Sequence, residues 1–229
     1  MTQDRIARMK QMSHPASPFD DFSLEYDAWF DKGGSLVFHI EVGALKKLLS
    51  ALPKPWVEVG VGSGRFAQAL GIKTGIDPSY RLLQMARRRG VKTLLGRGED
   101  TLFDKASFGT VFLIVTLCFV DSPLEVLEEA HRILMPDGSL VLGLVLKESP
   151  WGQFYQQKKA QGHRFYKHAN FYTYRETIDL MARKGFSTKR IVSTLFQKPG
   201  EVQQIEDPQE GYSPQAGFTL MVAGKSAKP

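Results

Sequence analysis

Three alternating glycines give this sequence its clearest chemical signal. In the segment WVEVGVGSGRFAQAL, residues 56–70, Gly60, Gly62 and Gly64 stand between a short apolar run and a second, helix-like apolar run. Glycine suits places where the backbone turns sharply and where a ligand must approach with no side chain in the way. The pattern therefore predicts a strand, a tight turn and a helix, with a nucleotide-like ligand bound at the turn.

The residues around these glycines narrow the kind of ligand. Gly62-x-Gly64-x-x-Ala67 formally fits the dinucleotide fingerprint, which leaves an NAD-type oxidoreductase open as an alternative. Glu58, however, lies inside the strand, two residues before Gly60, where a carboxylate suits a cationic or amine-bearing ligand better than a pyrophosphate. A P-loop is excluded because no Gly-Lys-Ser/Thr follows the turn.

The motif Glu58-x-Gly60-x-Gly62-x-Gly64 resembles the first signature of class I methyltransferases that depend on S-adenosylmethionine (SAM). The resemblance implies that SAM is the cofactor and that S-adenosylhomocysteine (SAH) is formed from it. The cofactor contacts that it implies in the turn are Glu58, Gly60, Gly62, Ser63 and Gly64.

The segment Gly75-Ile76-Asp77-Pro78-Ser79 is similar to the second strand of that family, whose terminal acid binds the ribose hydroxyls. Asp77 is the matching position, and Pro78 follows it. A carboxylate suits two adjacent hydroxyl donors. Asp77 could also serve as the N-cap of a helix before Ser79, and the two roles are compatible.

Further motifs follow in the family's order. Residues 97–103 resemble the stretch that contacts the adenine, which makes Gly98 and Glu99 candidate contacts, and Val115 and Thr116 end the fourth strand at the cofactor and substrate interface. Gly109 stands where the family usually has Asp, and Met-Pro-Asp-Gly at 135–138 replaces the common Lys-Pro-Gly-Gly. The resemblance covers about residues 20–225 and is specific for SAM binding rather than for the acceptor.

An alternation of strands and helices must position these motifs. Hydrophobic runs predict strands at 56–59, 73–76, 91–95, 111–115, 139–146, 188–195 and 217–223. Helices are expected at 65–70, 79–89, 123–134 and 174–184, with two more between residues 19 and 50. Pro136-Asp137-Gly138 predicts a turn, and residues 198–215 an exposed hairpin loop. The expected fold is α/β, a Rossmann-like, doubly wound sheet of seven strands, mostly parallel with an antiparallel last strand and flanked by helices.

The chain of 229 residues has the length of a single α/β domain with a substantial core. We expect a flexible tail at 1–18 and one methyltransferase domain at 19–229, with N-terminal helices at 19–50. After the fifth expected strand, residues 148–172 are aromatic and basic and show no strand pattern. We hypothesise that this insertion caps the active site.

The acceptor site must lie outside the core sheet, in the N-terminal helices and the insertion. Candidate substrate contacts are Tyr26, Trp29, Trp151 and Tyr155. Candidate catalytic residues are His39, His163, His168 and Tyr166, of which the three histidines are the candidate general bases. Each of these could instead pack the two segments against each other. A dedicated base is not obligatory, since in-line positioning of acceptor and methyl group already removes about 7–11 kcal/mol of the barrier.

The composition of the chain indicates which cellular compartment and which binding partners to expect. The single cysteine, Cys118, permits no intrachain disulfide and is expected to be a small buried hydrophobe. No Cys/His cluster has metal-ligand spacing, so no metal is expected. The N-terminus lacks a signal-peptide core, and the longest apolar run is about half a membrane span. We expect a cytoplasmic protein, a monomer or homodimer, that does not enter the membrane.

The leading function is methyl transfer from SAM to O, N or S of a small molecule. Methylation of RNA or protein is the first alternative, since the net charge is +6, and a SAM-binding module without catalysis is another. We expect Arg87-Arg88-Arg89, at a helix end, to interact with the helix dipole and stay solvated, which makes nucleic acid an unlikely partner. The sequence after the fourth strand, Thr116 to Pro123, also lacks an Asn/Asp-Pro-Pro-Tyr/Phe motif for methylating base amino groups.

Overall fold

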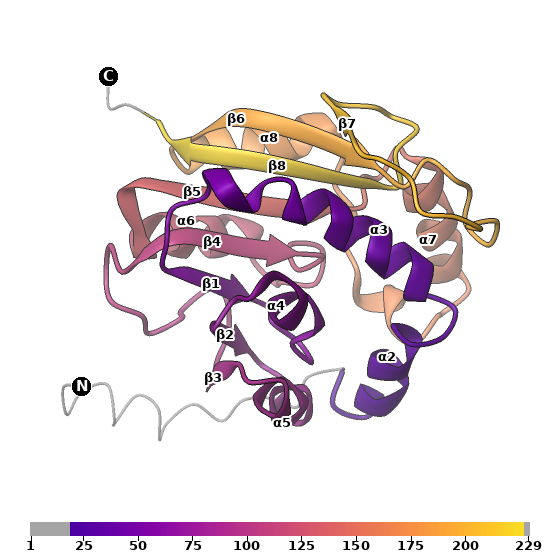
Figure 1. Ribbon diagram of the computed structural model, residues 1–229, viewed down its shortest axis with the longest axis horizontal. Coiled ribbons are helices and arrows are strands. Elements are labelled where there is room, and N and C mark those ends of the chain that lie inside the picture. The colour runs from indigo at the N-terminus through magenta and orange to yellow at the C-terminus, as the bar shows by residue number, and fades with distance from the viewer. Residues whose placement is uncertain (1–18, 227–229) are drawn as a thin grey trace.

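The computed structural model describes residues 19–226, so the expected tail at 1–18 lies outside the described residues. Its centre is one sheet in the order β3-β2-β1-β4-β5-β8-β6-β7 (Figure 1). The strands are β1 (Trp56–Val59), β2 (Thr74–Asp77), β3 (Lys92–Leu95), β4 (Phe108–Ile114), β5 (Leu134–Leu144), β6 (Phe186–Thr194), β7 (Gln209–Glu210) and β8 (Phe218–Lys225).

Strands β1 to β5 pair with one another in parallel, and β8 is antiparallel to both β5 and β6. The predicted doubly wound sheet with an antiparallel last strand is therefore confirmed. The strand count is eight instead of seven, because the loop predicted at 198–215 contributes the two-residue β7, which pairs with β6. This strand was not predicted because its two polar residues carry no hydrophobic pattern.

Helices cover both faces of the sheet. They are α2 (Ser23–Trp29), α3 (Ser35–Lys46), η1 (Leu49–Ala51), α4 (Arg65–Leu70), α5 (Tyr80–Arg88), α6 (Pro123–Ile133), α7 (Pro150–Ala160), η2 (Tyr166–His168) and α8 (Tyr174–Arg183). Buried residues of α3, α4, α5 and α7 belong to one hydrophobic cluster, and those of α6 and α8 belong to the other. Figure 1 shows α3 and α4 in front of the sheet and α6 and α8 behind it. The central strand β4 is buried along its whole length, as a parallel strand between two helical layers must be.

Serine and threonine caps begin the helices that flank the site. Ser79, Ser122 and Ser149 each accept a hydrogen bond from a backbone N–H in the first turn of α5, α6 and α7. Thr173 and Glu176 form a capping box at α8. The helix N-cap after β2 is thus Ser79, and the N-cap role considered for Asp77 is not the one it has.

Residues 148–172 contain more regular structure than their sequence predicted. They form α7 and the 3-10 helix η2, which Figure 1 shows at the end of the sheet beside α2 and α3. The Ser149-Pro150 pair is a helix-start signal, because Ser149 caps α7 and Pro150 occupies its first turn. The aromatic and basic composition concealed this helix.

Two findings concern the amino ends of β4 and β5. The turn predicted at residues 136–138 is not formed there, and the glycine at Gly109 has a structural reason. Pro136-Asp137-Gly138 lies within β5 as an irregularity and not as a turn before it, since the β4–β5 register shifts between Phe108 and Thr110. A Cβ at Gly109 would lie 2.6 Å from the Pro53 carbonyl oxygen. This close backbone approach explains why the usual Asp cannot stand at Gly109.

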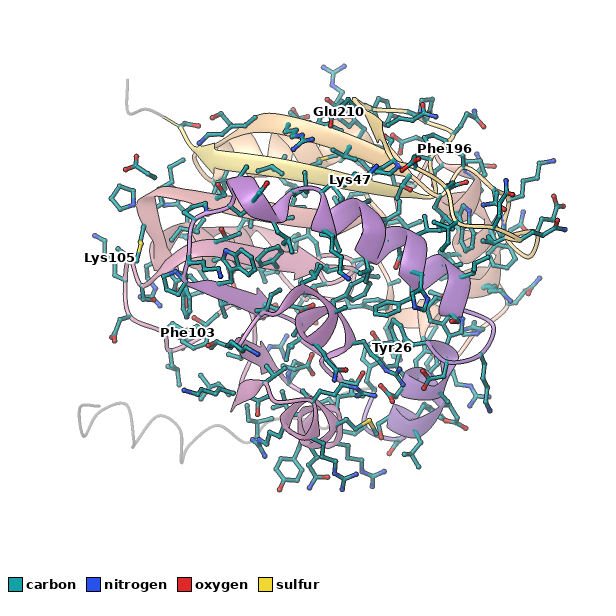
Figure 2. All side chains as sticks on the ribbon, viewed as in Figure 1. Tyr26, Lys47, Phe103, Lys105, Phe196 and Glu210 are labelled. Atoms are coloured by element: carbon teal, nitrogen blue, oxygen red, sulfur yellow. The ribbon has the colours of Figure 1, made fainter. Side chains whose placement is uncertain are left out.

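Two ion pairs connect the segment that contains β7 to the end of α3 and to β6. Lys47, which follows α3 and is labelled in Figure 2, donates from Nζ to Asp207 Oδ1 at 2.7 Å. Arg190 Nη2 donates to Glu210 Oε1 at 2.5 Å across the β6–β7 pair. All four side chains are largely exposed, so these pairs add little free energy of unfolding.

Candidate active site

The glycine turn joins β1 to α4 at the carboxyl edge of the parallel strands. Gly60, Gly62 and Gly64 have φ angles of +77°, +51° and +80°, in the left-handed region that favours glycine. A Cβ at Gly60 would lie 2.3 Å from Thr116 Cγ2, so a side chain there would clash with the end of β4. The turn therefore exposes backbone at the carboxyl ends of β1 and β4, between which the strand order reverses. Open α/β sheets bind ligands at such a position.

Glu58 puts a buried carboxylate beside this turn. Its side chain is 1% exposed and lines a cavity, and its Oε2 atom has no hydrogen-bond partner among residues 19–226. Burial, with the nearby Asp77, raises the pKa of Glu58 well above its usual value. A buried acceptor without a donor is unfavourable, so this oxygen suits a ligand that brings an N–H group, as the amino group of SAM does.

Asp77 at the end of β2 holds the turn in place. Its Oδ2 accepts from the backbone N–H of Gly62 at 2.9 Å, and its Oδ1 accepts from that of Ser79 at 2.8 Å. Burial raises the pKa of Asp77 to about 6, although these two hydrogen bonds act in the opposite direction. Each oxygen keeps a lone pair that ribose hydroxyls could use. Pro78, the next residue, is half-buried.

The predicted adenine contacts have structural roles in the protein itself. Glu99 Oε1 accepts from the backbone N–H groups of Asp121 and Ser122 at 3.2 and 3.4 Å, which fixes the loop before α6. A Cβ at Gly98 would lie 3.0 Å from Val59 Cγ1, so close packing accounts for this glycine.

The end of β4 carries a strained residue. Val115, which lines the cavity, has a φ of +51°, a conformation that β-branched residues rarely adopt. Its N–H donates to the Gly143 carbonyl at 2.8 Å, and Thr116 Oγ1 donates to the Ile114 carbonyl at 3.0 Å. The backbone thus bends sharply where the predicted cofactor and substrate sites meet, and such strain is often kept for function.

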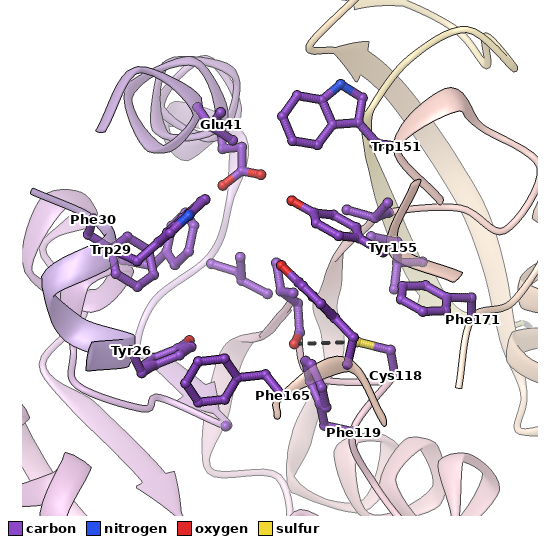
Figure 3. Close-up of a pocket in the computed structure, with 18 of the residues that line it drawn as sticks. Tyr26, Trp29, Phe30, Glu41, Cys118, Phe119, Trp151, Tyr155, Phe165 and Phe171 are labelled. Atoms are coloured by element: carbon purple, nitrogen blue, oxygen red, sulfur yellow. Dashed lines mark hydrogen bonds between the residues drawn. The ribbon is translucent and has the colours of Figure 1, made fainter. Parts of the chain in front are cut away.

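A cavity of about 470 Å³ extends from the glycine turn to α3, α7 and η2. Figure 3 shows it from within, with aromatic side chains on both sides and the Cys118 thiol below. Burial raises the pKa of Cys118 to about 12, consistent with the predicted small hydrophobe. The aromatic and histidine residues of the wall are Phe19, Tyr26, Trp29, Phe30, Phe66, Phe119, Trp151, Phe154, Tyr155, His163, Phe165, Tyr166, Phe171 and Tyr172.

The four predicted substrate contacts all line this cavity, although they come from two distant parts of the chain. Tyr26 and Trp29 lie on α2, and Trp151 and Tyr155 lie on α7. Trp151 Nε1 donates to the Gln197 carbonyl at 2.8 Å, and the rings of Tyr155 and Tyr166 stack at 4.3 Å. These contacts fix the orientation of the wall.

The four predicted catalytic candidates fall into two groups. His163 and Tyr166 line the cavity, and burial lowers the pKa of His163 and raises that of Tyr166 to about 12. His39 and His168 are exposed and are not among the lining residues. His39 Nδ1 lies 2.7 Å from the Ser35 carbonyl oxygen, to which it can donate within its own helix.

Two features of the site were missed at the level of sequence. Glu41 is 6% exposed and lines the cavity from the middle of α3, on a helix whose buried positions are otherwise apolar. A single carboxylate on an apolar helical face was the signal that could have identified it. Phe165 stacks on Phe19 at 5.6 Å and so joins the insertion to the N-terminal segment.

The basic run at the end of α5 also behaves differently from its predicted role. Arg89 is not solvated, because its Nη2 donates to Asp27 Oδ2 at 2.8 Å and its Nη1 to the Ser63 carbonyl at 2.7 Å. Arg87 Nε donates to Thr93 Oγ1 at 2.6 Å. The expectation of a solvated run is wrong for Arg89, which connects the glycine turn with α2.

Comparisons with known proteins agree with this geometry. A family model described as "Methyltransferase domain" matches residues 57–142, from β1 into β5. A solved structure from Thermotoga maritima, named as a SAM-dependent methyltransferase and "possible histamine N-methyltransferase", is 40% identical and has a TM-score of 0.85. That match covers 91% of this chain and 98% of the Thermotoga chain.

Two curated relatives, both named as uncharacterised proteins, are also similar. One from Methanocaldococcus jannaschii is 35% identical over 90% of this chain and 98% of its own length. One from Mycobacterium tuberculosis is 40% identical over 86% of this chain and 70% of its own length.

This chain belongs to the class I SAM-dependent methyltransferases. It is therefore a methyltransferase enzyme, and SAM is its cofactor. The unpaired oxygen of Glu58 and the glycine turn fit that cofactor, as described above. None of the helices between residues 19 and 226 is long and apolar enough to cross a membrane. Within the same residues no group of three or more His, Cys, Asp or Glu side chains could hold a metal ion.

Proposed function

We propose that this methyltransferase transfers the methyl group of SAM to a small molecule bound in the aromatic cavity. The observation that carries the proposal is the continuity of this cavity with the cofactor turn. Glu58, Gly60 and Ser63 line it at one end, and Trp151 and Tyr155 line it at the other. A cavity of about 470 Å³ is within the usual range for small-molecule sites.

The cofactor supplies an electrophilic methyl group on a positively charged sulfur. For this chain we propose that Glu58 accepts from the amino group of the cofactor and that Asp77 accepts from its ribose hydroxyls. Gly60, Gly62, Ser63 and Gly64 let the backbone approach, and Pro78, Gly98, Glu99, Val115 and Thr116 complete the proposed cofactor site. The aromatic wall then holds the acceptor in line and keeps water away, which is what such a reaction needs from a protein.

The insertion at 148–172 is proposed to be the cap of this site. Its residues Trp151, Tyr155 and Tyr166 face the cavity, and Phe165 closes onto Phe19 of the N-terminal segment. His163 and Arg164 lie at the same closure, where Arg164 Nη1 donates to Glu25 Oε1 at 3.1 Å. The cap and α2 therefore meet over the cavity, and opening them would admit the acceptor.

A small acceptor also agrees with a relative. The Thermotoga maritima protein is named for a small amine, histamine, although with the word "possible". The alternative acceptors, RNA and protein, have less support, because Arg89 of the densest basic run is occupied by Asp27 and Ser63.

Methyl-labelled SAM tests the proposal directly. The enzyme is incubated with separated small-molecule, RNA and protein fractions, and the label is followed into each. We expect label in the small-molecule fraction, and we expect Tyr166→Ala to lower it by about tenfold or more. His168→Ala, on the same 3-10 helix but exposed, is the matched control. Label confined to RNA or protein would overturn the proposal.

A further inference from the structure

Glu41 is a buried carboxylate for which the cofactor has no evident use. It is 6% exposed, and no described residue donates a hydrogen bond to it or forms an ion pair with it. Figure 3 shows its carboxylate pointing into the cavity, with Trp29 and Phe30 on one side and Trp151 and Tyr155 on the other. Because burying a carboxylate without a partner is costly, its position calls for a ligand that compensates the charge.

None of the cations on the cavity wall forms an ion pair with Glu41. Arg65 is held by Asp27 and Asp31, and Lys158 Nζ lies 4.8 Å from the centre of the Phe154 ring. His163 has its pKa lowered by burial, which favours the neutral ring. The titratable groups that sense the charge of Glu41 are Tyr155 and Tyr166, and both are weak acids whose pKa burial raises further.

The rings around Glu41 are suited to a cation. An ammonium group near the face of Trp, Tyr or Phe is attracted by the ring quadrupole, with a strength that grows as water is removed. Aromatic rings combined with one carboxylate form a site that neutralises a positive charge while excluding water. A hydroxyl or thiol acceptor brings no positive charge that could pair with an ionised Glu41.

We propose that the acceptor is an amine, bound as its ammonium form by Glu41 and the surrounding rings, and methylated on nitrogen. This inference rests on the proposed small-molecule function, and it narrows the acceptor from O, N or S to N. It also assigns a role to Glu41, which lies outside the glycine turn and its companion motifs.

The proposed reaction requires one proton transfer. An ammonium nitrogen has no lone pair, so one of its protons first moves to a Glu41 carboxylate oxygen. The nitrogen lone pair then forms the N–C bond as the C–S bond breaks, and the electron pair of that bond goes to sulfur, leaving neutral SAH. The product is a methylated ammonium ion, and the proton on Glu41 passes to water when the product leaves.

The acid strength of Glu41 fits this proton transfer. Burial alone raises the pKa of Glu41 to about 8, closer to that of an aliphatic amine than an ordinary glutamate would be. General acid–base partners work best when their pKa values are near each other and near the working pH. The cavity therefore makes Glu41 a stronger base than a solvated carboxylate.

Binding measurements with a panel of probes test the inference without turnover. Primary and secondary amines, from small aliphatic amines to 2-phenylethylamine, are compared with alcohols of the same carbon skeleton in the presence of SAH. Tryptophan fluorescence reports occupancy, because Trp29 and Trp151 line the cavity. Glu41→Gln keeps the side-chain shape, and Glu125→Gln, an exposed carboxylate on α6, is the matched control.

We expect at least one amine to bind more tightly than its alcohol and to be N-methylated by the wild-type enzyme. Glu41→Gln should weaken amine binding by about 30-fold or more, because it removes one partner of a buried charge pair. SAH binding and alcohol binding should stay unchanged in Glu41→Gln, and Glu125→Gln should behave like the wild type throughout.

Three results would overturn the inference: no amine of the panel binds, alcohols bind as tightly as amines, or Glu41→Gln keeps the amine preference. If alcohols or thiols take the methyl group instead, the small-molecule function stands and only the amine inference fails. If only RNA or protein is methylated, both fail.

Discussion

Asp27 on α2 and Arg65 on α4 form a bidentate ion pair, with Arg65 Nε 2.9 Å from Asp27 Oδ1 and Arg65 Nη2 2.8 Å from Asp27 Oδ2. Arg89 donates to the same Asp27 carboxylate and to the carbonyl of Ser63 in the glycine turn. Burial acts against the charge, but the bonds from Arg65 and Arg89 hold the pKa of Asp27 well below its usual value. The network fixes α2, and with it Tyr26, over the turn.

Asp27→Asn should therefore weaken both stability and cofactor binding. The substitution leaves two partly buried guanidinium groups without a charged acceptor, which costs about 1–3 kcal/mol. For a chain of this length we expect the melting temperature to fall by about 3–8 °C. SAH affinity, measured by calorimetry, should fall because Tyr26 is no longer held above Gly62.

Asp31→Asn is the matched control, since Asp31 accepts from the same Arg65 side chain but is largely exposed. It should change melting temperature and SAH affinity little. Equal effects of the two variants would contradict the account, because only Asp27 reaches both Arg65 and Arg89.

Gly64→Ala should destabilise the protein far more than Gly71→Ala. Both glycines flank α4 with nearly equal φ angles, +80° and +76°, so both variants suffer the same left-handed strain of about 1 kcal/mol. Only at Gly64 would the Cβ also meet backbone, 2.9 Å from Ala86 Cα on α5. Urea unfolding should show a clearly larger loss for Gly64→Ala, and similar losses would refute the packing argument.

SAH binding should weaken as the pH falls below about 6. Burial raises the pKa of Asp77 to about that value, and protonation removes an acceptor for the ribose hydroxyls. The ionised form binds better, so affinity is highest above the pKa and decreases below it. Calorimetry between pH 5 and 8 measures this dependence. Asp77→Asn should bind SAH weakly and lose the part of the pH dependence centred near pH 6, while any part that comes from Glu58 stays; a profile unchanged near pH 6 would exclude Asp77 as its origin.

Glu41→Gln should make the protein more stable at high pH. The pKa of Glu41 is about 8 in the folded protein against 4.5 in the unfolded chain, so the unfolded state releases its proton first. The contribution of Glu41 to the free energy of unfolding is therefore full below pH 4.5 and is lost as the pH rises to about 8.

The difference in the free energy of unfolding between Glu41→Gln and the wild type should thus grow from pH 5 to pH 9. It should gain about 2–5 kcal/mol over that range. Other titrating groups, such as Glu58 and Asp77, are present in both proteins and cancel in the comparison. Parallel stability curves would show that Glu41 does not carry a raised pKa.

The sheet and the cofactor turn followed from sequence because local rules determine them. The apolar run in β4 is typical of a buried parallel strand, and the glycines from Gly60 to Gly64 mark backbone that other residues form only with strain. Ser149 and Pro150 also carried a helix-start signal, although the composition of 148–172 concealed it. The irregular 135–138 segment depends on the pairing of β4 with β5, which no local pattern reveals.

The acceptor site was only partly accessible from sequence, because its residues meet through tertiary packing. Tyr26 and Tyr155 were chosen for their aromatic character, but their shared cavity depends on how α2 and α7 close over the sheet edge. Glu41 was missed because its chemistry comes from burial, which a sequence pattern shows only indirectly. Arg89 was misjudged for the same reason, since its partner Asp27 lies 62 residues away.

A crystal structure with SAH tests the central claim most directly, since the claim is that the glycine turn presents the cofactor's sulfur to the aromatic cavity. We predict that the SAH amino group donates to Glu58, that the ribose hydroxyls donate to Asp77, and that the sulfur faces the space between Glu41 and Tyr155. A sulfur directed away from that cavity, or SAH bound elsewhere, would contradict the account.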